Sequence, residues 1–277
     1  AIDGGDGSDV LAAFDVSGID NAWAVTGVGA GNVALESSPA EPYVVYTSIE
    51  SLVGGVGTDL LNLSGYDGDI AVSVGTLTAT DDIVDDFEMS AVGFEGAIGN
   101  DADGTGTYRS LLIVNDAAST ASTRWSVSDV NGGTVEGLDT EGDSVSSFTF
   151  AGFNTLWGDG EVDAFNVGAN VDSSIVGRES EIAGLGGADT FTVNTDVTLT
   201  ANIMGGDDAD VFSIAGTTTG NLDGGTGNDR FVIASTANVS SINGGDDLDT
   251  LASPGSNSEF ILAATNSLTD GAAAPVT

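Results

Sequence analysis

A short glycine-rich motif recurs at nearly constant intervals late in the chain, and it constrains the fold more than any other feature. Each copy places Gly first, Asp sixth and Phe or Leu eighth. Four copies begin at residues 184, 205, 224 and 244, and their sixth-position residues are Asp189, Asp210, Asp229 and Asp249. A sequence period of roughly 20 residues, as between these aspartates, is typical of solenoids, in which each repeat stacks on its neighbours.

The same motif occurs three more times upstream, beginning at residues 4, 54 and 158. Its sixth-position residues there are Asp9, Asp59 and Asp163. In all seven copies the residue two places before the first glycine position is Ile or Leu: Ile2, Leu52, Leu156, Ile182, Ile203, Leu222 and Ile242. Such agreement indicates one structural unit repeated along the chain.

The residues after each aspartate alternate between apolar and polar, as in Phe191 and Val193 or Phe212 and Ile214. This period of two is typical of half-buried strands. About 20 residues allow two or three strands of about five residues with their turns. We therefore predict an all-β fold, an elongated right-handed parallel β-solenoid of the β-helix or β-roll type, with about 20 residues per coil in the C-terminal part.

A longer repeat is also visible. Residues 124–127 resemble residues 22–25, with Trp125 matching Trp23. We expect residues 1–100 and 101–182 to be two diverged copies of a larger unit, 183–252 to be compact coils, and 253–277 to be a tail or the start of another repeat. Residues 81–90 are the best helix candidate, although a short turn fits equally well. Residues 1–3 match residues 241–243, so we expect the chain to be an internal piece of a longer protein.

The charge is extreme: 43 acidic residues face four arginines, with no lysine or histidine, and the net charge is −39. This charge argues against nucleic acid and anionic membranes as partners. It favours cations, or a strongly solvated surface in salty water. No run of 18 apolar residues is present, so we expect no membrane insertion. Cysteine is absent, and the redox compartment cannot be read from the sequence.

Stacked coils would bring the sixth-position aspartates about 4.8 Å apart. Two such charges repel by roughly 3 kcal/mol at an effective dielectric constant of 20, so cations between them would be stabilising. Carboxylate and carbonyl oxygens suit Ca²⁺, whereas zinc and copper sites are not expected without Cys or His. Further acids lie in or beside the turns: Asp207, Asp208, Asp223, Asp246 and Asp247.

Three copies resemble the RTX nonapeptide, also called the haemolysin-type calcium-binding repeat, G-G-x-G-x-D-x-(apolar)-x. They are G-G-D-G-S-D-V-L-A at 4–12, G-G-V-G-T-D-L-L-N at 54–62 and G-G-T-G-N-D-R-F-V at 224–232. In that family the six-residue turn binds Ca²⁺ through its Asp and turn carbonyls. The resemblance therefore implies side-chain ligands at Asp9, Asp59 and Asp229, and carbonyl ligands at Gly4, Asp6, Gly54, Val56, Gly224 and Thr226.

The chain departs from the family pattern in two ways. RTX arrays run their nonapeptides in tandem, two to each coil, whereas this chain has a single motif in each period. Leu185, Asp208 and Asp247 also replace turn glycines. The wider spacing is similar to acidic repeat regions of very large secreted bacterial surface proteins, which implies an extracellular or cell-surface location.

The residues leave alternatives open. Each motif aspartate could instead accept backbone N–H bonds in a turn, without any metal. Trp23 and Trp125 could stack on sugars or lie in the core. We expect a non-catalytic structural segment of a filament, surface layer or adhesin stalk that self-associates or continues end to end. The alternatives are a carbohydrate- or surface-binding module and, less favoured because His and Lys are missing, a β-helix enzyme acting on polysaccharides. No catalytic or organic-cofactor residues are predicted.

Overall fold

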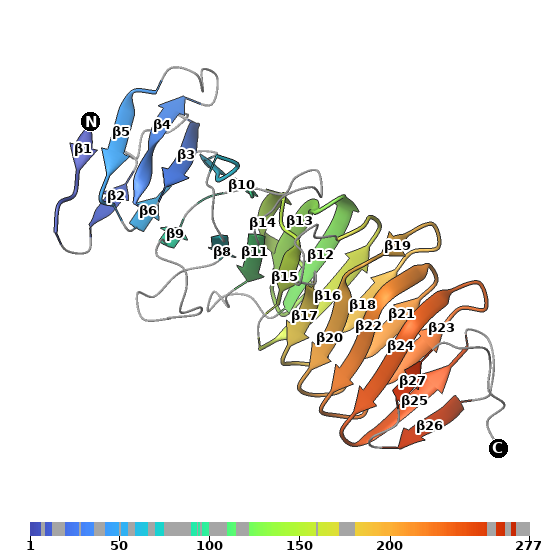
Figure 1. Ribbon diagram of the computed structural model, residues 1–277. Helices are drawn as coiled ribbons and strands as arrows, with labels where there is room; N and C mark the ends of the chain where they lie inside the picture. The colour runs from blue at the N-terminus through green and yellow to red at the C-terminus, as the bar shows by residue number, and fades with distance from the viewer. Residues whose placement is uncertain are drawn as a thin grey trace.

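The computed structural model describes most of the C-terminal half of the chain and parts of the N-terminal half. The described residues are 1–6, 9–12, 20–27, 29–35, 42–49, 51–54, 59–65, 70–74, 90–92, 94, 96–99, 110–114, 122–158, 160–171, 181–253, 259–263 and 267–269. Every regular element among them is a β-strand, and most strand pairs are parallel (Figure 1). The predicted all-β class is therefore confirmed.

The strands form two long sheets and one small sheet. The first sheet contains, in spatial order, β1 (Ile2–Asp3), β5 (Val44–Thr47), β4 (Ala30–Leu35), β3 (Asn21–Gly27), β7 (Asp59–Asn62), β10 (Gly96–Ile98), β14 (Ser144–Ala151), β13 (Gly132–Leu138), β12 (Ser122–Asp129), β16 (Val162–Val167), β18 (Thr190–Val193), β21 (Val211–Ile214), β23 (Arg230–Ile233), β25 (Leu248–Ala252) and β26 (Glu259–Ala263).

The second sheet contains, in spatial order, β27 (Ser267–Thr269), β24 (Asn238–Gly245), β22 (Thr217–Gly225), β20 (Asn202–Gly206), β17 (Glu181–Leu185), β15 (Thr155–Trp157), β11 (Ser110–Val114) and β8 (Ile70–Val74). The short strand β19 (Thr198–Leu199) pairs with β22. The small sheet contains β2 (Val10–Ala12), β6 (Ser51–Val53) and β9 (Ser90–Val92).

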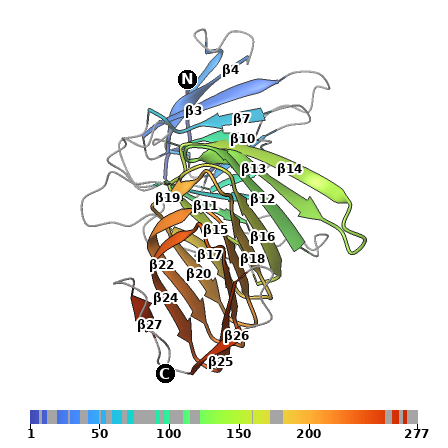
Figure 2. The same ribbon diagram turned by 90° about the vertical axis from the view of Figure 1, so that its right-hand side faces the viewer.

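From β15 to β25 the chain passes repeatedly between the two long sheets (Figures 1 and 2). Each of the five motifs that begin at 158, 184, 205, 224 and 244 joins a strand of the second sheet to the following strand of the first sheet, as between β20 and β21. Equivalent strands pair in parallel, so that Phe191 lies opposite Phe212 and Phe212 opposite Phe231. One period of the sequence therefore contributes one strand to each long sheet; we call this unit a coil.

The core between the sheets is built from rows of identical positions. On the first sheet the aromatic rings of Trp125, Phe165, Phe191, Phe212 and Phe231 stack in sequence, with centroids 4.5–5.2 Å apart. On the second sheet the apolar position before each motif forms a facing row: Leu156, Ile182, Ile203, Leu222 and Ile242. All of these side chains are buried. Leu52 is also buried, whereas Ile2, on the edge strand β1, is 41% exposed.

Two antiparallel meanders interrupt the parallel order. Strands β3, β4 and β5 form the first, and β12, β13 and β14 form the second. The opening strand of each meander pairs in parallel with a motif strand, β7 or β16. Trp23 and Trp125 occupy matching positions and are both buried, so they are core residues and are not available to stack on sugars.

Antiparallel strands border the C-terminal coil. Strand β26 pairs with β25 in the first sheet, and β27 pairs with β24 in the second. Apart from Ser90, which begins β9, the helix candidate at 81–90 lies outside the described residues. No helix in the described ranges has the length and apolar character needed to cross a bilayer.

The aromatic stack predicts a large cost for removing one ring. Phe212 is fully buried and stacks on Phe191 and Phe231. Phe212→Ala should destabilise the protein by about 3–5 kcal/mol, because it removes apolar burial and leaves a cavity. Urea unfolding followed by circular dichroism measures this loss.

The control for this prediction is Val211→Ala, on the outward side of the same strand. It should cost about 1 kcal/mol or less, which is the range of strand-propensity differences at partly exposed positions. An equal cost for both variants would contradict the central role of the stack.

Candidate functional site: a buried row of aspartates

The sixth-position aspartates form one continuous row inside the first sheet. Asp163, Asp189, Asp210, Asp229 and Asp249 precede or occupy the start of adjacent parallel strands, and all five are buried. The backbone N–H of each of the first four residues donates to Oδ1 of the aspartate in the next coil, at 2.7, 2.8, 2.8 and 3.0 Å along the row. The four carboxylates from Asp189 to Asp249 therefore bind the backbone of the preceding coil, while Oδ1 of Asp163 accepts from Oγ1 of Thr123, and the row links successive coils.

The first glycine of each motif makes room for the second carboxylate oxygen. A Cβ atom added to Gly184, Gly205, Gly224 or Gly244 would collide with Oδ2 of the aspartate five residues later. Gly158 has the same relation to Asp163. Only glycine, which has no Cβ, leaves this space. The spacing between Gly and Asp in the motif thus follows from a steric requirement within one coil.

Burial changes the protonation of the row. It raises the pKa of Asp210 to about 7, opposed by the hydrogen bond from Asp189 and reinforced by the negative charges of Asp229, Asp208 and Asp207. Burial likewise raises the pKa of Asp229 to about 6, again opposed by its backbone hydrogen bond, and also raises the pKa of Asp249. Oδ2 of each of these three residues is buried and accepts no hydrogen bond within the described part of the chain. The neutral carboxyl form is therefore favoured toward acidic pH.

The turns between the sheets stack directly on one another. The N–H groups of Asp207, Thr226 and Asp246 donate to the carbonyl of the second motif residue in the preceding coil, at 2.8–2.9 Å. A Cβ on Gly206, Gly225 or Gly245 would collide with that same carbonyl. The residues that replace turn glycines keep the left-handed backbone, with φ of 81° at Leu185 in the second motif position and 74° at both Asp208 and Asp247 in the fourth. Asp tolerates this region well, whereas Leu does so at a cost.

The other turn residues with predicted metal roles lie outside the buried row. Asp207, Asp208, Asp246, Asp247 and Thr226 are exposed, and Asp223 is half-buried. Thr226 donates from Oγ1 to Oδ1 of Asp207 at 3.0 Å. Exposed carboxylates thus lie on the outer side of the turns in two coils, which the coil of Thr226 separates, and a cation has access to them.

The N-terminal copies are arranged differently. Asp59 is buried on β7, and Oδ1 accepts from Nδ2 of Asn21 at 2.6 Å and from Nε1 of Trp23 at 3.4 Å. It is separated from Asp163 by β10, β14, β13 and β12, so it does not join the main row. Asp9 and Gly4 are half-buried, Asp6 is exposed and Gly54 is buried. Val56 lies outside the described residues.

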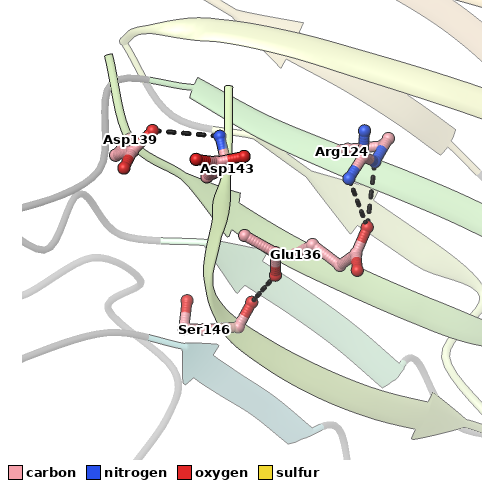
Figure 3. Close-up of polar contacts among 6 residues, drawn as sticks. Arg124, Glu136, Asp139, Asp143 and Ser146 are labelled. Carbon is pink, nitrogen blue, oxygen red and sulfur yellow. Dashed lines mark hydrogen bonds and ion pairs between the residues drawn. The ribbon is translucent and has the colours of Figure 1, made fainter. Parts of the chain in front are cut away.

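The structure also brings together an acidic cluster that the motif analysis missed. Carboxylate oxygens of Asp139, Glu141 and Asp143, in the turn between β13 and β14, lie within 4.8 Å of one another and could hold a metal ion. Oδ1 of Asp139 already accepts the N–H of Glu141 at 2.9 Å and the N–H of Asp143 at 3.0 Å, and Figure 3 shows the second of these bonds. Nearby, both Nε and Nη2 of Arg124 lie 2.9 Å from Oε2 of Glu136 (Figure 3). Acids at alternate positions between two strands, D-x-E-x-D, are the sequence signal for this cluster.

Comparison with protein-family models, curated proteins and solved structures gives no match for this chain. The site is therefore interpreted from its own geometry.

The raised pKa values predict that the row loses stability as pH rises. Because folding raises the pKa of Asp210 from 3.8 to about 7, the folded state binds more protons between these values. The contribution of Asp210 is fully present below about pH 4 and is lost as pH rises through about 7. Asp210→Asn keeps an oxygen acceptor but does not titrate, so its stability relative to the parent should increase by on the order of 1–3 kcal/mol between pH 4 and pH 8.

Urea unfolding of both proteins at several pH values, with a chelator present, measures this difference. Taking the difference between the two proteins removes the general effect of net charge. A difference that stays constant across this range would show that Asp210 titrates near its ordinary pKa. Asp196→Asn, at an exposed position between β18 and β19, is the control and should change little with pH.

Proposed function

We propose that this chain is a non-catalytic structural segment of a large extracellular repeat protein, such as a filament, surface layer or adhesin stalk, and that it self-associates or continues end to end. The observation that carries the proposal is the aspartate row. Its carboxylates bind the backbone of the neighbouring coil, and its glycines fit those carboxylates. The recurring residues thus hold coils together, which is the chemistry of a scaffold.

Within this proposal, the alternating strands wind as a right-handed parallel β-solenoid with one motif in each coil. The parallel register of the aromatic and aliphatic rows supports stacking of equivalent coils. A solenoid lengthens by adding coils without enlarging its cross-section, which suits a stalk or filament. The extracellular location rests on the resemblance of the motifs to RTX repeats of secreted bacterial surface proteins.

We further propose that Ca²⁺ stabilises the protein by binding at the outer side of the turns. The buried row fits such a role poorly, because Oδ1 of each aspartate after Asp163 already accepts a backbone N–H and Oδ2 lies against glycine. The exposed acids offer adjacent carboxylates within a single turn, at 207 and 208 in one coil and at 246 and 247 in another, with the coil of Thr226 between them. Hard oxygen ligands of this kind suit Ca²⁺.

The calcium proposal predicts a stability gain that depends on these turn acids. Ca²⁺ at about 100 times its dissociation constant would add about 2.7 kcal/mol per site. Thermal unfolding should therefore shift upward with Ca²⁺ more than with Mg²⁺ at equal ionic strength. The variant Asp207→Asn/Asp208→Asn should lose part of the shift, because Asn keeps the backbone geometry but removes the charge.

The matched control is Asp129→Asn/Asp196→Asn, which removes two exposed carboxylates that lie outside the motif turns. It should retain the full calcium shift. If Mg²⁺ and Na⁺ stabilise the parent as well as Ca²⁺ does, the role of calcium is refuted, while the scaffold role of the buried row is unaffected.

The structural proposal predicts reversible self-association. Sedimentation velocity over a wide range of protein concentration, in about 0.5 M NaCl to screen the net charge of −39, should give a mass that rises above that of a single chain. Electron microscopy of the concentrated sample should show elongated or regular assemblies. A single-chain mass at every concentration and salt level would contradict self-association.

A further inference from the structure

The outward side of the first sheet lacks acidic residues over the C-terminal coils. Side chains alternate across each strand, so the partners of the buried Phe and Val residues point to solvent. On β16, β18, β21, β23 and β25 these outward residues are Val, Leu, Ala, Thr, Ser, Asn and one arginine, Arg230. None of them is Asp or Glu. We call this surface, the outward side of these five strands, the neutral face.

This composition is unusual for a chain with 43 acidic residues and a net charge of −39. The acids are found instead at the turns, as at Asp207 and Asp246, and in the loop at Asp139–Asp143. The adjoining strands β12 and β13 extend the face. They add Arg124 and Glu136, whose charges pair with each other.

The neutral face also exposes apolar side chains. Leu248 on β25 is 62% exposed and Val162 on β16 is 43% exposed, while Val211 and Val232 between them are half-buried. Rows run in register across the face, as in Thr190, Val211, Arg230 and Thr250. These pairings include no bulge from β16 to β25, which favours a regular surface.

We propose that the neutral face binds the neutral face of a second copy of this chain; this inference rests on the self-association proposed above and names its surface. Two copies that each carry −39 repel, and burying an unpaired carboxylate at an interface is costly. Close contact is therefore cheapest where carboxylates are absent. Sheets can pack face to face at about 10 Å through small and β-branched side chains such as those found here.

The size of the face is sufficient for a reversible contact. The neutral face and the adjoining outward side of β12, β13 and β14 together comprise eight strands, each about 4.8 Å from the next, which span about 38 Å, and about five residues of strand add about 16 Å in the other direction. This extended surface of eight strands then covers about 600 Å² per copy. The two copies together bury about 1,200 Å², at the lower end of specific interfaces. Lateral pairing of moderate strength, repeated along a longer array, follows from this area.

The test adds two negative charges to the face and compares them with the same charges elsewhere. Thr190→Asp/Thr192→Asp places carboxylates on exposed positions of β18. The matched control, Asn202→Asp/Asn221→Asp, changes β20 and β22 on the second sheet and keeps the Oδ1 atom that accepts the N–H of Asn221. Sedimentation equilibrium in about 0.5 M NaCl gives the dissociation constant of each protein, and circular dichroism melts check the fold. Thr192→Asp alone replaces the double variant if that variant melts earlier than the parent.

We expect the face variant to associate at least 10-fold more weakly than the parent, while the control associates as the parent does. Raising the salt concentration should strengthen association of the parent, since screening reduces repulsion. Association that survives in the face variant places the contact elsewhere and overturns this inference, while the structural proposal stands. A parent that stays a single chain under all conditions overturns both.

Discussion

The hydrogen bond from a backbone N–H to the aspartate of the next coil is the interaction on which the C-terminal structure depends. It occurs between Asp163 and Asp189 and is repeated three times toward Asp249. Each bond joins positions one full coil apart in the sequence, so it fixes which residues lie opposite each other in the two strands. With this register set, the aromatic side chains two residues later must stack, and the rings from Phe165 to Phe231 do so.

The buried aspartates make two contributions of opposite sign to the free energy of folding. Burying carboxyl groups beside one another is unfavourable when they are ionised, as the raised pKa values of Asp210 and Asp229 reflect. Binding backbone N–H groups that would otherwise lack a partner is favourable, since an unmet buried donor costs about 1–3 kcal/mol. The aromatic stack lies on the same strands as the aspartates. Its burial is favourable and offsets part of the cost of burying the carboxyl groups.

Much of this architecture could be predicted from the sequence, because the alternation along strands and the regular recurrence of the motif along the chain both leave clear patterns. The alternation at Phe191 and Val193 predicted the inward side, and the aliphatic residue before each motif predicted the facing row. The location of Asp210 could not be predicted in this way. The motif leaves open whether its carboxylate points outward to a cation or inward to the next coil, and the space left by the missing side chain of Gly205 permits the inward direction. The cluster at Asp139, Glu141 and Asp143 was missed because it belongs to a single turn and has no repeat to reveal it.

In every coil the motif glycine and aspartate are separated by the same number of residues, whereas the number of residues in the rest of the coil varies. Successive aspartates in the row are 26, 21, 19 and 20 residues apart, yet the backbone bonds between them are nearly identical. The differences in length are taken up after the strand of the first sheet, on the side away from the motif. The two edges of the stack therefore have different tolerance to sequence change: the motif edge keeps the register, while the opposite edge can accept insertions of varied size and chemistry. Related scaffolds could therefore share the same motif edge and differ in the loops that they carry along the opposite edge.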